Sequence, residues 1–143
     1  MLVGEPFSRA AAAGLHLVEH GVGAFLDAWQ QKPIIATQER IASPWREQMR
    51  ERREQASGAG WRNSLLAAGT GSMEPVWHDL EHVHTPTLLI TGQEDAKFHQ
   101  IAEQMRELFP KATHTSIPSA GHCAHLENPS PTARAIHAFL GDL

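Results

Sequence analysis

The sequence has only one cysteine and no long apolar run, which argues against a protein stabilised by disulfides within the chain and against a membrane-spanning one. Because Cys123 is the only thiol among 143 residues, no disulfide can form within the chain, as is usual in a reducing compartment. No apolar stretch approaches the roughly 20 residues that a bilayer-spanning helix needs. Residues 1–4 also lack the basic and apolar regions of a signal peptide. We therefore expect a cytoplasmic protein with no membrane segment.

A large excess of positive charge is also missing, which removes the usual electrostatic basis for binding nucleic acid. The formal net charge is −4, and most basic residues are scattered along the chain. The densest basic stretch runs from Arg46 to Arg53, where Glu47 and Glu51 interrupt it. That alternation is typical of a solvated helix face. We predict no nucleic-acid partner.

The ten histidines raise the question of a metal site. His78 and His82 have the i, i+4 spacing of one helix face, and His84 follows closely. No cysteine stands beside them, and His84 falls beyond the expected end of the helix. We therefore predict no metal, and the sequence implies no organic cofactor.

The hydrophobic pattern divides the chain into a helical first part and a second part with strands. Residues 1–76 have apolar side chains at three- and four-residue intervals, broken by glycine and proline, and carry no strand signal. The run 88–90 lacks alternation, which predicts a parallel strand buried on both faces. A second short strand is expected over 113–117, with a helix after each strand and Pro110 ending the first of them. The predicted fold class is α/β.

Each predicted strand ends in a loop that carries a chemically useful side chain. Asp95 follows the first strand and His122 follows the second. Because the carboxyl ends of parallel strands meet at one edge of a sheet, we expect the two side chains within hydrogen-bond reach. An acid that orients a histidine is the arrangement of a general base. The plainer alternatives are a helix N-cap for Asp95 and a backbone-bonded turn histidine for His122.

The two loops together resemble those of one α/β-hydrolase family, the 2-succinyl-6-hydroxy-2,4-cyclohexadiene-1-carboxylate synthases of menaquinone biosynthesis. The likeness lies in Gly92-Gln93-Glu94-Asp95-Ala96-Lys97-Phe98, in Ala120-Gly121-His122 and in His125-Leu126-Glu127-Asn128-Pro129. That family also has a serine on a Gly-x-Ser-x-Gly elbow, a pentapeptide that occurs nowhere in this sequence. The chain thus resembles the carboxyl-terminal half of such an enzyme. The expected order is a helical cap, residues 1–76, then the last two parallel strand-helix units of the core, residues 77–143.

The resemblance implies a lyase that abstracts a proton from its substrate and eliminates pyruvate. His122 would be the base and Asp95 the acid that orients it, in a Ser-His-Asp triad whose serine is absent from this chain. The resemblance also implies that Trp29 and Arg53 contact a small carboxylate substrate, a group that arginine binds bidentately. Packing between helices is the alternative for Trp29, and the solvated helix face is the alternative for Arg53.

The residues around His122 have more modest expected roles. His125 and Glu127 are expected to fix the loop by hydrogen bonds. Cys123 stands next to the predicted base, but neighbouring side chains on an extended loop point apart. We therefore expect a small buried thiol there and not a nucleophile.

Two other functions stay open. The histidine loop is shared widely among α/β-hydrolases, so the same residues also suit a hydrolase of an ester or a carbon–carbon bond. A chain without the nucleophile could also be a non-catalytic binding or interaction fragment. In each case the apolar strand 88–90 predicts an exposed sheet edge that self-associates or pairs with the missing amino-terminal half in trans. By itself the chain is predicted to be inactive.

Overall fold

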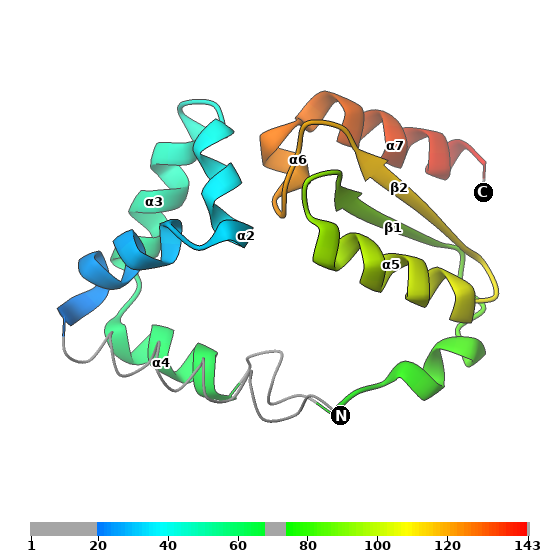
Figure 1. Ribbon diagram of the computed structural model, residues 1–143, viewed down its shortest axis with the longest axis horizontal. Coiled ribbons are helices and arrows are strands. Elements are labelled where there is room, and N and C mark those ends of the chain that lie inside the picture. The colour runs from blue at the N-terminus through cyan, green and yellow to red at the C-terminus, as the bar shows by residue number, and fades with distance from the viewer. Residues whose placement is uncertain (1–19, 68–73, 143) are drawn as a thin grey trace. The chain divides into compact units, whose positions relative to one another are not determined.

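A computed structural model describes residues 20–67 and 74–142 of the chain (Figure 1). The chain forms two compact units, one from residues 1–31 and 47–75 and the other from residues 32–46 and 76–143. We call them the helical unit and the strand unit and describe each by itself. None of the helices in the described ranges is long and apolar enough to cross a membrane.

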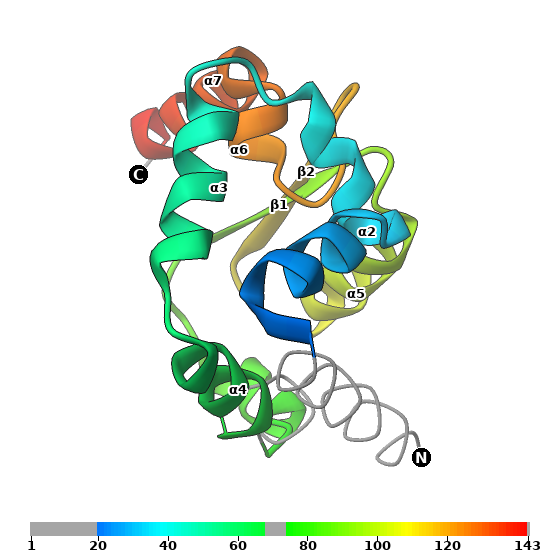
Figure 2. The same ribbon diagram turned by 90° about the vertical axis from the view of Figure 1, so that its left-hand side faces the viewer.

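The helical unit is held together by aromatic packing. Residues 20–30 are helical, most of α3 (Trp45–Gln55) follows, and α3 leads into α4 (Gly58–Ala67) (Figure 2). The Phe25 ring is buried, with its centroid 5.5 Å from that of Trp29 and 5.6 Å from that of Trp61. The Trp61 indole N–H also donates to the Arg53 carbonyl at 3.0 Å. Burial of these rings joins α4 to the 20–30 helix.

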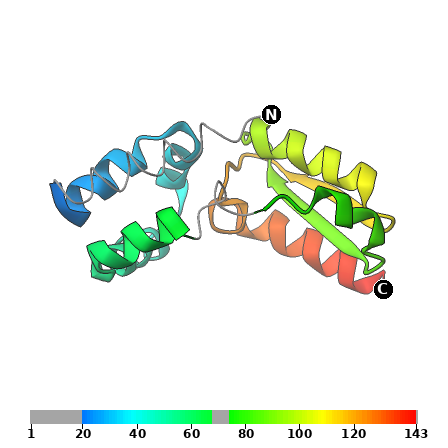
Figure 3. The same cartoon turned by 90° about the horizontal axis from the view of Figure 1, so that it is seen from below.

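The strand unit contains a parallel pair of strands between two long helices. The pair is β1 (Thr87–Gly92) and β2 (Ala112–Ile117), in a register that places Thr87 opposite Ala112 and Gly92 opposite Ile117. Helices α5 (Ala96–Leu108) and α7 (Pro129–Gly141) cover opposite faces of the sheet (Figure 3). The unit also includes these short helices: α2 (Pro33–Ala36), η1 (Thr37–Arg40), η2 (Trp77–His82) and α6 (Ala124–Glu127). The predicted α/β class and the two parallel strand-helix units are confirmed.

Sequence features explain where the elements of the strand unit begin and end. Asp95 caps the amino terminus of α5, and Pro129 occupies the first turn of α7, where its missing N–H costs nothing. The core under the histidine loop is almost completely closed, because Ile117 is 1% exposed and Ala120 is 0% exposed. The prediction for β1 differs in one respect, since its residues 87–91 are only half-buried. The reason is that β1 pairs with β2 alone within the described residues.

The strand unit takes in residues 32–46, which the sequence prediction had placed with the helical segment 1–76. Two long-range contacts account for this. The Thr37 hydroxyl donates to the Glu127 carboxylate at 3.0 Å, and Arg40 forms a two-pronged ion pair with Glu94. Residues 37–40 thus lie against the loops that follow both strands.

The close approach of the two strand-end loops generates a testable prediction. A Cβ on Gly92 would lie 2.1 Å from the Gly121 carbonyl oxygen and 2.3 Å from that of Ala120. These are backbone atoms, so Gly92→Ala must push the loops apart, and we expect a loss of about 1–3 kcal/mol in the free energy of unfolding. Gly141→Ala is the matched control, because a Cβ there meets nothing within 4 Å. Urea unfolding measures both variants, and equal stabilities would contradict the prediction.

Candidate active site

Asp95 and His122 form the centre of the candidate site. His122 Nδ1 lies 2.6 Å from Asp95 Oδ2, so the hydrogen bond expected from the sequence is present. The Asp95 side chain is 7% exposed, whereas that of His122 is 38% exposed. A neutral imidazole that donates from Nδ1 carries its lone pair on Nε2. The pair therefore has the geometry of a base that is oriented from behind by a buried carboxylate.

Both partners of this pair are fixed by further contacts. The second carboxylate oxygen of Asp95 accepts the backbone N–H of Phe98 at 3.3 Å, which caps α5. The N-cap alternative and the orienting role thus coexist in one side chain, each using its own oxygen. The Phe98 ring packs against the imidazole of His122, with ring centroids 4.6 Å apart. Phe98 therefore restricts the position of the imidazole.

Glu127 organises the loop that carries His122. Its Oε2 accepts the Gly121 N–H at 2.7 Å, and its Oε1 accepts the Cys123 N–H at 3.0 Å. The Thr37 hydroxyl donates to the same Oε1. The expectation that Glu127 fixes the loop by hydrogen bonds is confirmed. His125 makes a weaker contact, its Nε2 lying 3.9 Å from the Cys123 sulfur, and Cys123 is half-buried.

Backbone hydrogen bonds join the acid loop to the histidine loop. The Gln93 N–H donates to the Ile117 carbonyl at 2.8 Å, and the Glu94 N–H donates to the Ala120 carbonyl at 2.9 Å. Both bonds run past the last residue pair of the parallel strands. The ladder thus continues into the loops and fixes the distance between their side chains.

Glu94 stands next to Asp95 in sequence but has a different role. Arg40 pairs with it, and this hydrogen bond holds the pKa of the Glu94 carboxyl below its ordinary value. The carboxylate is 41% exposed and faces the guanidinium, whereas the imidazole bonds to Asp95. The carboxylate that His122 contacts is therefore Asp95, while Glu94 is held by Arg40.

A cavity of about 220 Å³ opens beside the pair. Asp95, His122 and Gly121 line one part of it, and Lys97 adds a cation. The remaining lining residues are Pro33, Ile34, Thr37 and Glu94. The whole cavity belongs to the strand unit, with α2 and η1 forming one of its walls.

Sequence reasoning missed the contributions of Thr37 and Arg40. Thr37 is 90 residues from its partner Glu127, and Arg40 is 54 residues from Glu94. No local pattern marks either residue, because only the folded chain places η1 against the loops.

The two predicted substrate contacts, Trp29 and Arg53, lie in the helical unit. Trp29 packs partly buried against Phe25, as the packing alternative expects. Arg53 is half-buried, and its carbonyl accepts the Trp61 indole N–H. Their role in binding a substrate stays a prediction.

Residues 16–129 match the model of a protein family described as the alpha/beta hydrolase fold. This match covers most of the chain, so the chain belongs to that family. Parallel strands that end in an acid and a histidine agree with this assignment.

Within the family, the chain is similar to 2-succinyl-6-hydroxy-2,4-cyclohexadiene-1-carboxylate synthases. It is 32% identical to the putative synthase of Bacillus subtilis (strain 168) over 124 residues, which are 87% of this chain and 45% of the relative. It is also 32% identical to the synthase of Pectobacterium atrosepticum over 115 residues, 80% of this chain and 42% of the relative. The solved structure of MenH from S. aureus matches with a TM-score of 0.89 and 27% identity, covering 99% of this chain and 55% of that one. The chain spans about half the length of these relatives.

The bonds to Glu127 lead to a prediction about the mobility of the histidine loop. Hydrogen bonds to a charged group contribute roughly 1.5–3 kcal/mol each, so their loss should speed local opening by at least about tenfold. We expect Glu127→Ala to accelerate amide hydrogen exchange at Gly121 and Cys123 by that factor. Glu107→Ala, at an exposed position of α5, is the control and should leave both rates unchanged. Unchanged rates in Glu127→Ala would show that the loop is held by other contacts.

Proposed function

We propose that the chain supplies the base and the orienting acid of a Ser-His-Asp triad in a lyase that eliminates pyruvate. The product would be 2-succinyl-6-hydroxy-2,4-cyclohexadiene-1-carboxylate, an intermediate of menaquinone biosynthesis. The 2.6 Å bond between His122 and Asp95 carries the proposal, because it holds a general base at the carboxyl ends of parallel strands. The names of the similar synthases support the choice of reaction. We also propose a cytoplasmic location.

The proposed chemistry assigns one task to each residue of the pair. Nε2 of His122 accepts the proton of the hydroxyl of an elbow serine, whose Gly-x-Ser-x-Gly motif this sequence lacks, and the serine oxygen then takes a proton from the substrate. The electron pair left on the substrate carbon forms a new double bond as the bond to the pyruvyl oxygen breaks. Asp95 keeps the imidazole in its Nδ1–H tautomer and stabilises the imidazolium that forms. The proton on His122 is then available to the departing group.

The substrate carries carboxylates, and the chain offers cations that suit them. Lys97 lines the cavity beside His122. Arg53 and Trp29 of the helical unit are the proposed contacts that the resemblance indicates, with the guanidinium binding a carboxylate bidentately. In this proposal, the helical unit acts as a cap that supplies substrate contacts and no proton transfer.

The serine must come from outside this sequence, and the outer edge of β1 is the proposed place where its segment docks. Within the described residues β1 is paired on one side only, so its other edge has backbone groups that can pair with a further strand. We propose that the amino-terminal half of an α/β-hydrolase binds there in trans, or that the edge pairs with a second copy of the chain.

A chimaera tests the triad directly. In it, this chain replaces the part of the Bacillus subtilis relative that it matches, and the relative keeps the rest of its own sequence. We expect pyruvate release from the chimaera and none from the chain alone. Asp95→Asn should lower kcat by about 10⁴-fold, the loss seen when a triad acid can no longer hold the tautomer. His125→Ala is the control and should retain most of the activity.

Labelling by a serine-directed phosphonate shows whether the chimaera has folded with a reactive serine, independently of whether it releases pyruvate. A chimaera that is labelled but does not release pyruvate would support the alternative of an ester or carbon–carbon bond hydrolase. Pyruvate release by the chain alone at an enzymatic rate would contradict the proposal, because the nucleophile would then be one of its own residues.

Arg53 provides a separate prediction about substrate binding. If it binds the carboxylate equally in the ground state and the transition state, Arg53→Ala in the chimaera should raise KM by more than it lowers kcat. Arg52→Ala is the control at an exposed neighbouring position of α3. A fall in kcat with unchanged KM would instead assign Arg53 to the transition state. Unaltered kinetics would show that Arg53 does not contact the substrate and would favour the alternative of a solvated helix face.

A further inference from the structure

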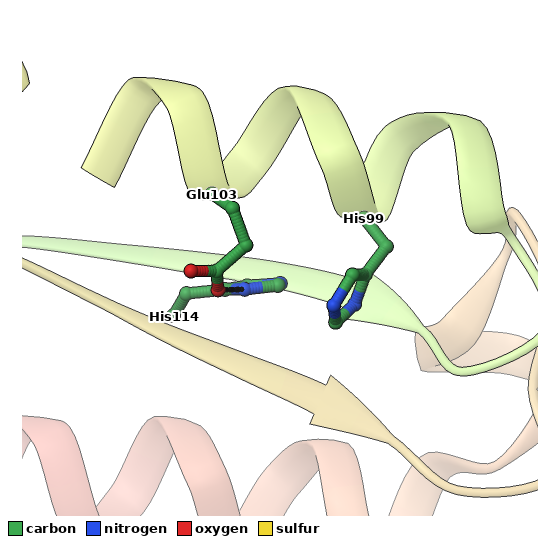
Figure 4. A group of neighbouring side chains, drawn as sticks. All are labelled: His99, Glu103 and His114. Carbon is green, nitrogen blue, oxygen red and sulfur yellow. Dashed lines mark hydrogen bonds and ion pairs between the residues drawn. The ribbon is translucent and has the colours of Figure 1, made fainter. Parts of the chain in front are cut away.

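His99, Glu103 and His114 form a cluster away from the pair that the proposed function uses. His99 and Glu103 are one helical turn apart on α5, and His114 comes from β2 beneath that helix (Figure 4). One nitrogen of each histidine and one oxygen of the glutamate all lie within 4.8 Å of one another. The imidazole rings have centroids 4.9 Å apart and are inclined by 58°. The three side chains thus converge from two elements that pack together in the strand unit.

We propose that this cluster is a binding site for a divalent transition metal, with zinc as the preferred ion. Two imidazole nitrogens and one carboxylate oxygen are a ligand set that zinc takes, with water in the fourth position. Such a site joins α5 to β2 and uses neither Asp95 nor His122 as a ligand.

The positions of the ligand atoms fit zinc after a small adjustment. In a tetrahedral site with bonds of about 2.0–2.1 Å, ligand atoms lie about 3.3 Å apart. His114 Nδ1 is now 2.5 Å from Glu103 Oε1, joined by a hydrogen bond, so these two atoms must separate by less than an ångström. His99 must move inward by rotation of its side chain, which is half-buried and so has room to turn. The ion would then take the place of the proton that His114 and Glu103 share.

The hydrogen-bond partners of the ligands allow a metal ion to replace the proton between His114 and Glu103. His114 Nε2 lies 2.8 Å from the Thr91 hydroxyl oxygen, so it can donate to that oxygen once Nδ1 binds the metal. Neutral His114 therefore changes tautomer without losing a partner. Arg106 holds the other carboxylate oxygen of Glu103 at 2.9 Å, which leaves Oε1 to face the imidazoles. Hydrogen bonds of this kind orient metal ligands in known sites.

Burial distinguishes this cluster from scattered surface histidines. The His114 side chain is only 3% exposed, while that of Glu103 is 40% exposed. One ligand of the site is therefore buried, and another is open to solvent. An ion can therefore enter without unfolding of the strand unit. His99 also donates its backbone N–H to the Asp95 carbonyl at 2.9 Å. A metal on His99 would consequently stiffen the turn of α5 that carries the acid of the candidate site.

Titration of the chelator-treated chain with zinc chloride tests the proposal. We expect one equivalent to bind by calorimetry and the unfolding midpoint to rise by at least about 4 °C at saturation. Cobalt chloride should give the visible absorption of a tetrahedral site, and zinc should abolish it. Binding of less than half an equivalent, or cobalt spectra of octahedral ions only, would overturn the proposal.

Variants identify the ligands. His99→Gln and Glu103→Gln each lie toward the solvent-accessible side and should weaken zinc binding at least about tenfold, as loss of a ligand requires. The double variant His78→Gln, His82→Gln is the matched control, because it removes another exposed histidine pair at i, i+4. It should bind zinc like the parent chain. Parent-like binding by His99→Gln, or loss of binding in the control, would place the ion elsewhere and reject this site.

Discussion

The parallel pairing of β1 with β2 is the constraint on which the rest of the strand unit depends. Its register places Gly92 opposite Ile117, so the loops that follow leave the sheet at the same edge. Backbone bonds from Gln93 and Glu94 then carry the pairing two steps beyond the strands. The hydrogen bond between Asp95 and His122 is the next contact in that series. The geometry of the Asp95–His122 pair is thus an extension of the sheet and not a separate feature built on flexible loops.

Close backbone contact makes this extension possible. Gly92 has no side chain where the carbonyls of Ala120 and Gly121 approach, and Gly121 in turn leaves space that Thr37 fills. Two carboxylates also hold η1 against the strand-end loops. Glu127 accepts hydrogen bonds from the histidine loop and from η1, and Glu94 forms an ion pair with Arg40 of η1. Glycine provides proximity, and the carboxylates of Glu127 and Glu94 then fix the orientation of the groups brought together.

Local sequence signals were enough to predict the central part of this arrangement. The unbroken apolar run before Gly92 predicted a parallel strand, and the acid and the histidine at the strand ends predicted a bonded pair. The half-burial of β1 departs from the burial on both faces that its apolar run predicts, because β1 has one neighbouring strand within the described residues. The place of residues 32–46 was also missed, since Thr37 and Arg40 find their partners 90 and 54 residues away. Contacts at such separations leave no periodic signal in the sequence.

The cluster of His99, Glu103 and His114 was likewise not predictable from the sequence. The spacing of His99 and Glu103 was readable as one helix face, but His114 joins them only after β2 packs beneath α5. His78, His82 and His84 are neighbours in the chain, so their spacing draws attention to them instead. A search for ligands that are close in sequence does not find side chains that only the folding of the sheet brings together.

The bond between His122 Nδ1 and Asp95 implies that neutral His122 carries its proton on Nδ1 and its lone pair on Nε2. Nitrogen NMR of the chain with labelled histidine measures this directly, because the two tautomers of a neutral imidazole give different shifts at Nδ1 and Nε2. We predict that neutral His122 is protonated at Nδ1 and that Asp95→Asn shifts the population towards the Nε2–H form. A neutral His122 that is protonated mainly at Nε2, with no change in Asp95→Asn, would show that Asp95 does not set the tautomer.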